Sequence, residues 1–473
     1  MKKVMNKLSL FGFFAITLVM VLDVYEYPIF ATSGLELIFF LVVGGLLWFV
    51  PAALCAAEMA TIKGWERGGI YTWVKNTLGK KWGWLAIFCQ WFQITVGFVT
   101  MLYFIVDGLA EVTSAQTINE NPLWKFGLIV IIFWLLSLSQ MGGTKKTEVF
   151  GKIASVIGIF APIIILFVLT TIFIVSGGTS QITLSPQDFW PDFSQPATMV
   201  VFVSFILSYM GVEASASYVN ELKNPQRNYP LAIFLVVLTA ILVNAIGGLS
   251  VAVAIPSAEL SLGSGVSQTL NVFFAHLGLH WEPIVKIVTL MLMMGVIGEI
   301  AGWVVGPAKG LLVAAEENLL PSQFKKTNKH GVPIMIVIGQ GLLVTMWAAI
   351  LTFSGGGNNL SFQIAISLTV VIYLIAYLLF FSGFIKLVWK QQKLKRVFEI
   401  SGGKIVKTLV AGAGLTSSIF ALVISFWAPT NLSSSEAHIY MIVLIVGFIA
   451  TLLLALLIYK FMSKKENHAR TLQ

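Results

Sequence analysis

The stretch Val21-Leu-Asp-Val-Tyr-Glu-Tyr-Pro28 decides the fold, because it puts two carboxylates and a proline inside a run that is otherwise apolar enough to enter a bilayer. An acidic side chain such as Asp23 or Glu26 costs at least ~2.5 kcal/mol at membrane depth. Pro28 removes a backbone donor and disfavours helix in the residue before it. Charge and irregular backbone are tolerated at that depth where they are buried in protein or line a watery cavity. The stretch therefore predicts an interrupted helix on a substrate pathway rather than a simple anchor.

The composition of the whole chain is that of a polytopic membrane protein. Of its 473 residues, 57% are hydrophobic and 11% are charged, and the mean hydropathy is +0.89, whereas a soluble domain has roughly 25% charged residues. No small-residue cleavage site follows the basic start 1–7, so no cleavable signal peptide is expected. Cys55 and Cys89 both fall in apolar runs, which predicts two buried free thiols rather than a disulfide.

Apolar runs of about 20 residues predict membrane-spanning helices. The fold class expected from them is an all-α polytopic membrane protein with 12 transmembrane helices. The runs cover 8–31, 35–61, 83–109, 123–140, 150–176, 197–218, 229–254, 283–313, 332–353, 361–387, 406–427 and 437–461.

Lysine and arginine residues alternate from loop to loop. They gather before the first run, after every second run and in the tail, whereas the loops 110–122, 177–196, 255–281, 354–360 and 428–436 are nearly free of them. Basic loops stay in the cytosol, so the net charge of +9 is assigned to cytosolic loops rather than to a nucleic-acid surface, and both termini are predicted to be cytosolic. Every loop is too short to bury a core of its own.

A second interruption falls in the sixth run, at Phe205-Ile-Leu-Ser-Tyr-Met-Gly-Val-Glu-Ala-Ser-Ala-Ser217, where Gly211 and Glu213 follow an apolar half. Interrupted segments at matching positions of two halves point to the central site of a transporter. The first and sixth runs are five apart, and a five-helix unit repeated once must be inverted, because five is odd. Glycine and serine also serve simply as helix-packing residues, but the carboxylate of Glu213 and the matching break in the first run favour a site.

Two further helices carry polar side chains at depth. Glu299 and Trp303 are four residues apart and share a helix face; a carboxylate and an indole on one face suit an ammonium ligand. Tyr373 and Tyr377 are also one turn apart. The alternatives are a buried glutamate bonded to a neighbouring helix and two ordinary core tyrosines.

Other polar residues are interpreted as structural, and several classes of site are not expected. Gln90 and Gln93 are interpreted as helix-packing residues, and Glu58 as a charge near a helix end. The histidines lie in loops, at the end of a run or in the tail, so no run has a histidine in its interior, and no metal-ligand spacing, catalytic nucleophile motif or nucleotide-binding loop is found. We therefore expect no catalytic residues, no metal and no cofactor, and neither an enzyme nor an ATP-driven pump.

With these residues in hand, the chain is identified as a member of the amino acid–polyamine–organocation superfamily, and it most resembles the glutamate/γ-aminobutyrate antiporter branch. The resemblance extends from about Leu8 to the twelfth run. It rests on Tyr25-Glu-Tyr-Pro28, Phe30-Ala-Thr-Ser-Gly34, Ala56-Ala-Glu-Met-Ala-Thr61, Gly142-Gly-Thr-Lys145, Ser208-Tyr-Met-Gly-Val-Glu-Ala-Ser215, Glu299-Ile-Ala with Val305-Gly-Pro307, Gly355-Gly-Gly-Asn-Asn359 and Leu368-Thr-Val-Val-Ile-Tyr373.

The resemblance implies a 5+5 inverted repeat with broken helices 1 and 6, plus two extra helices. The implied parts are a cytosolic N-terminus (1–7), a first repeat (8–176), a second, inverted repeat (197–387), helices 11 and 12 (406–461) and a cytosolic tail (462–473). It also implies that pore-lining positions fall on Tyr25, Glu213, Glu299, Trp303, Tyr373, Tyr377 and, as a gate, Leu207. Gly211 and Asp23 join this set as substrate-binding candidates from the residue pattern.

The chain departs from the branch in two ways. Members of the branch have a long C-terminal extension that plugs the cytosolic side at neutral pH, whereas only about a dozen residues follow the twelfth run here, so that form of pH gating is not expected. They also carry a small apolar residue where this chain has Asp23. A fixed anion there should attract a cationic amine, since opposite charges about 4 Å apart gain ~4 kcal/mol at an effective dielectric of about 20.

The function expected from the sequence is an antiporter in a bacterial-type plasma membrane that exchanges an external amino acid or amine precursor for the amine made from it. Tyrosine/tyramine, histidine/histamine and agmatine/putrescine fit Asp23 best. The alternatives are glutamate/γ-aminobutyrate exchange and a proton-coupled amino-acid symporter. The expected partners are small-molecule substrates and the lipid bilayer, with no nucleic acid, and the oligomeric state is left open between monomer and homodimer.

Overall fold

The computed structural model describes residues 7–65, 67–115, 117–183, 185–279, 281–353, 357–391, 393–396, 398–429 and 432–471. Residues 1–6 and 354–356, on which part of the charge pattern and of the resemblance rests, lie outside these ranges. Within the described ranges the regular structure is helical, and β-pairing is confined to isolated bridges. Eleven helical segments of that part of the chain are long and apolar enough to cross a membrane.

The twelfth expected span, 197–218, is not among them because it is divided into short pieces: α11 (Pro196–Met199), α12 (Phe202–Leu207) and a 3-10 helix, η5 (Ala214–Glu221). The other helices are α1 (Leu10–Val19), α2 (Tyr27–Ala31), α3 (Glu36–Gly44), α4 (Val50–Ala60), α5 (Ile70–Leu78), α6 (Lys80–Thr113), α7 (Thr117–Glu120), α8 (Pro122–Ser139), α9 (Thr144–Ile153), α10 (Ala161–Val175), α13 (Pro225–Ala254), α14 (Gly265–His276), α15 (Glu282–Glu316), α16 (Ile334–Phe353), α17 (Gly357–Lys390), α18 (Gly403–Ile424) and α19 (Ser434–Thr471).

The first span is broken where the sequence predicted it. The Ser9 side chain caps the start of α1 by accepting a hydrogen bond from the Gly12 N–H. The helix ends at Val19, Asp23 has non-helical backbone angles (φ −96°, ψ 79°), and a 3-10 turn, η1 (Val24–Glu26), leads into α2. Pro28 lies in the first turn of α2, where its missing N–H removes no helical hydrogen bond. The carboxylates thus lie on the irregular stretch between two half-helices.

The sixth span is broken at Gly211, whose φ of +106° is accessible to glycine but strained for other residues. The chain turns between the end of α12 at Leu207 and the start of η5 at Ala214. The two breaks meet, because a Cβ on Gly211 would lie 2.5 Å from the Met20 carbonyl oxygen of the first break.

Four spans form the centre of the bundle and three lie at its edge. The segments Leu10–Ala31, Lys80–Thr113, Glu282–Glu316 and Asn359–Lys390 are the most buried, whereas Pro122–Gly142, Gly403–Ile424 and Ser434–Lys465 are mostly exposed apolar surface. An outer helix that presents apolar side chains outward is what a lipid solvent requires. Cys55 and Cys89 are buried free thiols, as predicted.

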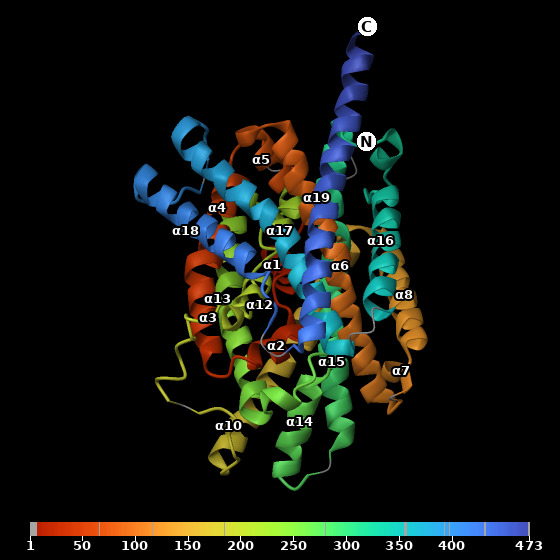
Figure 1. The fold of residues 1–473 in the computed structure, drawn as a ribbon. Coiled ribbons are helices and arrows are strands. Elements are labelled where there is room, and N and C mark those ends of the chain that lie inside the picture. The colour runs from red at the N-terminus through yellow and green to blue at the C-terminus, as the bar shows by residue number, and fades with distance from the viewer. Residues whose placement is uncertain are drawn as a thin grey trace.

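The two ends of the bundle differ in their loops. In Figure 1, α5 and the C-terminal end of α19 lie at one end, and α7 and α14 lie at the other. The first end, called the basic end below, carries the Lys- and Arg-rich loops; the opposite end carries the loops that are nearly free of both. The alternation read from the sequence therefore matches the arrangement of the helices.

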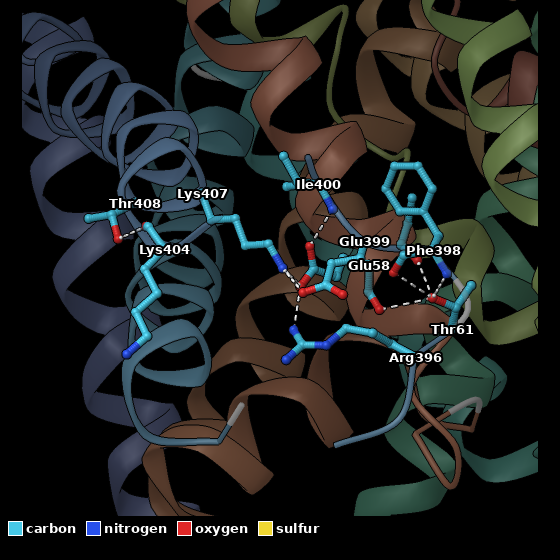
Figure 2. Close-up of polar contacts among 10 residues, drawn as sticks. Glu58, Thr61, Arg396, Phe398, Glu399, Ile400, Lys404, Lys407 and Thr408 are labelled. Atoms are coloured by element: carbon cyan, nitrogen blue, oxygen red, sulfur yellow. Dashed lines mark hydrogen bonds and ion pairs between the residues drawn. The ribbon is translucent and has the colours of Figure 1, made fainter. Parts of the chain in front are cut away.

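A buried ion cluster fastens the segment after α17 to the basic end of α4 (Figure 2). The Glu58 carboxylate is fully buried and accepts hydrogen bonds from Arg396, from Lys407 Nζ at 3.0 Å and from the Ile400 N–H at 2.8 Å. Lys407 also pairs with Glu399, whose side chain is 59% exposed. Hydrogen bonds and charge from Lys407 hold the pKa of Glu399 below its usual value.

Replacing Glu58 by glutamine should destabilise the protein by roughly 3–5 kcal/mol, because it leaves two buried cations without their shared anion. The measurement is the apparent melting temperature of the purified protein in detergent. Glu399→Gln is the matched control, since an exposed ion pair contributes little.

The pKa of Glu399 is lowered in the folded state. Its small contribution to the free energy of unfolding is therefore present above the unfolded-state pKa and is lost as the pH falls through the folded-state pKa. Equal melting temperatures for Glu58→Gln and the unmodified chain would contradict the role given to Glu58.

Candidate functional site

A small chamber lies between the two helix breaks. It is lined by Met20, Asp23 and Tyr25 from the first span, Leu207 and Met210 from the sixth, Gln93, Ile94, Gly97 and Met101 from α6, Glu299 and Trp303 from α15, and Thr369 and Tyr373 from α17. Its volume is about 10 Å³, which is room for about one water molecule. The structure is therefore a closed form, in which side chains fill the space between the breaks.

Trp303 is held across the chamber by the end of α1. Its indole Nε1–H donates a hydrogen bond of 3.1 Å to the Met20 carbonyl oxygen, one of the groups that a helix end leaves without an internal partner. The backbone of Gly211 packs directly against the Trp303 ring, since a Cβ on Gly211 would lie only 2.8 Å from the ring atom Cζ2. One contact region thus joins both breaks and α15.

Glu213 lies directly behind the chamber wall and is fully hydrogen-bonded. Its carboxylate accepts hydrogen bonds from Gln90 Nε2 at 2.8 Å and from the hydroxyls of Tyr373 and Tyr377. The Tyr377 hydroxyl also accepts a bond of 3.2 Å from the Gly211 N–H. This network ties the sixth-span break to α6 and α17, and it leaves Glu213, Gly211 and Tyr377 outside the chamber lining.

Two carboxyl groups line the chamber itself and a third lies nearby. Asp23 is 4% exposed, Glu299 1% and Glu26 0%. Within the described ranges, neither carboxylate oxygen of Glu299 or Glu26 has a hydrogen-bond partner, and no lysine, arginine or histidine lines the chamber. A buried carboxylate without a partner is costly. The chamber can therefore accept a cationic group or hold protons on its carboxyl groups.

A larger cavity of about 300 Å³ lies between the chamber and the end of the bundle opposite the basic end. Its lining includes Ile29, Ser204 and Gln363, and these residues lie about one to two turns from Tyr25, Leu207 and Thr369 of the chamber. The Tyr25 ring packs edge-on against Phe362, with ring centroids 6.2 Å apart. Tyr25 and Leu207 therefore lie in the layer that separates the two spaces.

Residues 8–448 of the chain match the family model described as amino acid permease. The chain belongs to this family. A glutamate/gamma-aminobutyrate antiporter of Lactococcus lactis subsp. lactis (strain IL1403) is 54% identical over 98% of this chain and 92% of its own length. An antiporter of the same name from Lactococcus lactis subsp. cremoris (strain MG1363) is 55% identical over the same shares. A probable agmatine/putrescine antiporter of strain IL1403 is 22% identical over 80% of each chain. The resemblance seen in the sequence motifs is thus confirmed.

The basic end of this permease is tied together by ion pairs between segments that flank the central spans. Arg67 pairs with Glu316 at 2.7 Å, Lys75 pairs with Glu317 at 2.5 Å, and Lys309 pairs with Glu221. Burial acts to raise the pKa of Glu317, but hydrogen bonds from Lys75 and Tyr71 hold it below its usual value. These pairs join the turn before α5, α5 itself and η5 to the last turns of α15, on the side opposite the 300 Å³ cavity.

Several residues of the permease site were not assigned from the sequence. Gln90 had been interpreted as a packing residue, yet it bonds Glu213. Met20, Met210 and Thr369 line the chamber although nothing in their residue type marks them. For Met20 and Met210 the available signal was their position beside the breaks, at the end of α1 and next to Gly211; Thr369 lies within α17 and had no such signal. Among the described residues, no group of three or more histidine, cysteine, aspartate or glutamate side chains is placed to hold a metal ion.

Proposed function

We propose that this permease is an antiporter that exchanges external glutamate for internal γ-aminobutyrate across a bacterial plasma membrane, with both termini in the cytosol. The main support for an exchange site at this place is the closed chamber between the two helix breaks, whose lining includes Asp23, Glu299 and Trp303. The choice of substrate pair is supported by the names of the relatives at 54% and 55% identity. It departs from the amine pairs that Asp23 favoured in the sequence.

The carboxyl groups of the chamber are compatible with this pair if they exchange protons. In the protonated form Asp23 and Glu299 are neutral hydrogen-bond donors, so a glutamate molecule is not repelled. In the ionised form they attract the ammonium group of γ-aminobutyrate, and Trp303 adds a cation–π contact on the same side. External acid, which protonates both the chamber and the substrate side chain (ordinary pKa about 4.3), then favours glutamate uptake.

The remaining site residues have supporting roles in this proposal. The backbone groups exposed at the breaks of spans 1 and 6 hold the α-carboxylate and α-amino groups of the substrate. Glu213, Gly211, Tyr373 and Tyr377 fix the second break through their hydrogen bonds. Tyr25 and Leu207 act as the gate between the chamber and the cavity of about 300 Å³. The two breaks belong to repeats 8–176 and 197–387, which we infer to be related by inversion.

The decisive experiment is counterflow in proteoliposomes. Vesicles loaded with γ-aminobutyrate should take up labelled glutamate from an acidic medium, and empty vesicles should not. Parallel vesicles loaded with tyramine, histamine or putrescine test the other pairs. Exchange only with one of these amines would overturn the substrate assignment, and proton-driven uptake into empty vesicles would indicate a symporter instead.

The same vesicles should become electrically negative inside during exchange. With the vesicle interior also buffered below about pH 4.3, where the carboxyl group of γ-aminobutyrate is largely protonated, glutamate without net charge that enters in exchange for the γ-aminobutyrate cation moves one positive charge outward per cycle, worth ~2.3 kcal/mol per 100 mV. A potential-sensitive dye measures this. With a neutral interior γ-aminobutyrate leaves as a zwitterion and no charge moves, whereas an exchange of agmatine for putrescine, both dications, is silent at either internal pH. The absence of a signal with the acidic interior would therefore contradict the proposed pair.

A further inference from the structure

A third cavity, separate from the chamber and from the 300 Å³ cavity, lies at the basic end and has a volume of about 750 Å³. It is lined by Trp65, Asn76, Trp389, Lys390, Gln391, Lys393 and Leu394. These residues come from three places: the turn before α5, α5 itself and the end of α17 with the segment that follows it. The proposed transport function assigns nothing to this cavity.

The wall of the cavity is fixed by the contacts that dock the segment after α17. Gln391 Nε2 donates a hydrogen bond of 2.9 Å to the Asn76 carbonyl oxygen. Further along, Ile62 and Arg396 form an antiparallel bridge, and the Phe398 N–H donates to the Thr61 hydroxyl at 3.2 Å. The Glu58 cluster then anchors Arg396, as Figure 2 shows. The cavity is therefore shaped in advance by the fold.

The same contacts sort the basic side chains of this region into two groups. Arg396 and Lys407 are buried and neutralised by Glu58, with Glu399 as a second anion for Lys407. Lys390 and Lys393 are exposed and, within the described ranges, have no acidic partner. Among the residues that the structure describes, no aspartate or glutamate lines the cavity. The cavity is left with two positive charges and suits an anion.

The position of the cavity identifies the kind of anion. Lys390 is the last residue of α17, a helix long and apolar enough to cross a membrane, so the cavity lies at the end of that helix and beyond its apolar stretch, on the side where lipid headgroups begin. Trp389 beside it is 51% exposed, with its Nε1–H bonded to the Thr408 hydroxyl at 3.0 Å, and tryptophans at helix ends typically lie among lipid headgroups. A volume of about 750 Å³ is also far larger than a single small anion requires.

We propose that this cavity binds the phosphate-bearing headgroup of an anionic membrane lipid. Lys390 and Lys393 contact the phosphate, and Trp65 and Trp389 pack against the glycerol and upper acyl carbons. Basic pockets between membrane helices bind such headgroups in this way. A bound headgroup joins the end of α17 to α5, and so stabilises the closed basic end. This proposal does not depend on the substrate pair.

The test measures the apparent melting temperature of the delipidated full chain in detergent against added phosphatidylglycerol. Wild-type protein should be stabilised by phosphatidylglycerol and not by phosphatidylcholine. The double variant Lys390→Gln/Lys393→Gln should need about 30-fold more phosphatidylglycerol for half of the effect, because each lysine near a membrane surface contributes about a factor of five. Lys326→Gln/Lys329→Gln removes two exposed charges from the same end outside the cavity, and should behave like wild type.

Each other outcome counts against the proposal. Equal stabilisation by phosphatidylcholine, or an unchanged phosphatidylglycerol dependence in the Lys390/Lys393 variant, would overturn the site. The full effect from inorganic phosphate or glycerol phosphate alone would show a site for a soluble anion and overturn the lipid assignment. Native mass spectrometry provides a second measurement, since bound phosphatidylglycerol should be retained by wild type and by the Lys326/Lys329 variant, and lost from the Lys390/Lys393 variant.

Discussion

Replacing Asp23 by asparagine should weaken binding of the cationic exchange partner by at least ~30-fold, because removing one member of a buried charged pair costs 2–5 kcal/mol. Asp23 is 4% exposed and lines a chamber in which none of the described lining residues is cationic. Under the proposed function, the substrate ammonium is the cation that pairs with the Asp23 carboxylate. The measurement is the concentration of γ-aminobutyrate that half-inhibits glutamate counterflow.

The control for this variant is Asp192→Asn, which makes the same change of charge in an exposed loop at the end opposite the basic end. Both variants should reach the membrane in the same amount as the unmodified chain, because Asp23→Asn conserves side-chain volume. An unchanged half-inhibition concentration in Asp23→Asn would make this carboxylate a structural group and remove it from the substrate site.

Replacing Gly211 by alanine should abolish measurable exchange. Its φ of +106° disfavours a side chain by roughly 1–2 kcal/mol, and the added methyl group would lie 2.5 Å from the Met20 carbonyl oxygen and 2.8 Å from Trp303. Overpacking of this kind typically costs a further 1–3 kcal/mol. The clash pushes apart the two breaks and the tryptophan that bridges them, so both the exchange rate and the apparent melting temperature should fall.

Gly127→Ala is the matched control for Gly211→Ala. Gly127 lies within α8, and a Cβ there would meet no atom within 4 Å, so alanine should leave exchange unchanged and slightly favour the helix. Exchange at wild-type rate in Gly211→Ala would show that the two breaks need not approach as closely as this conformation has them.

The two helix breaks at the site could be predicted from the sequence, because the residues that cause them lie within the broken segments themselves. Carboxylates combined with Pro28 in the first run, and with Gly211 in the sixth, disfavour an uninterrupted span, and the structure has breaks at both places. A carboxylate or a proline alone is not sufficient, because Glu299 and Pro307 lie within the continuous helix α15. Helix lengths were less well predicted: the third span was expected to cover 83–109 and extends over Lys80–Thr113. Polar residues at helix ends continue the helix beyond the apolar run, which hydrophobicity alone does not detect.

Partnerships between distant residues could not be predicted. The Glu58 carboxylate pairs with Arg396 and Lys407, which lie 338 and 349 residues away along the chain, and a charge near a helix end gives no indication of such partners. Glu213 was expected beside the substrate, and whether its carboxylate faced the chamber or Gln90, Tyr373 and Tyr377 depended on how three helices pack. Residue types indicated that buried polar groups need partners, but only the assembled bundle specifies them.

The near absence of free space in the central chamber has a consequence for the cell. Protons cross proteins rapidly along continuous files of water molecules, and a chamber with room for about one water interrupts any such file. A carrier in this conformation therefore offers protons no continuous file of water through the chamber when no substrate is bound. Under the proposed function, idle copies of the carrier in this conformation would therefore not dissipate the potential that the exchange builds.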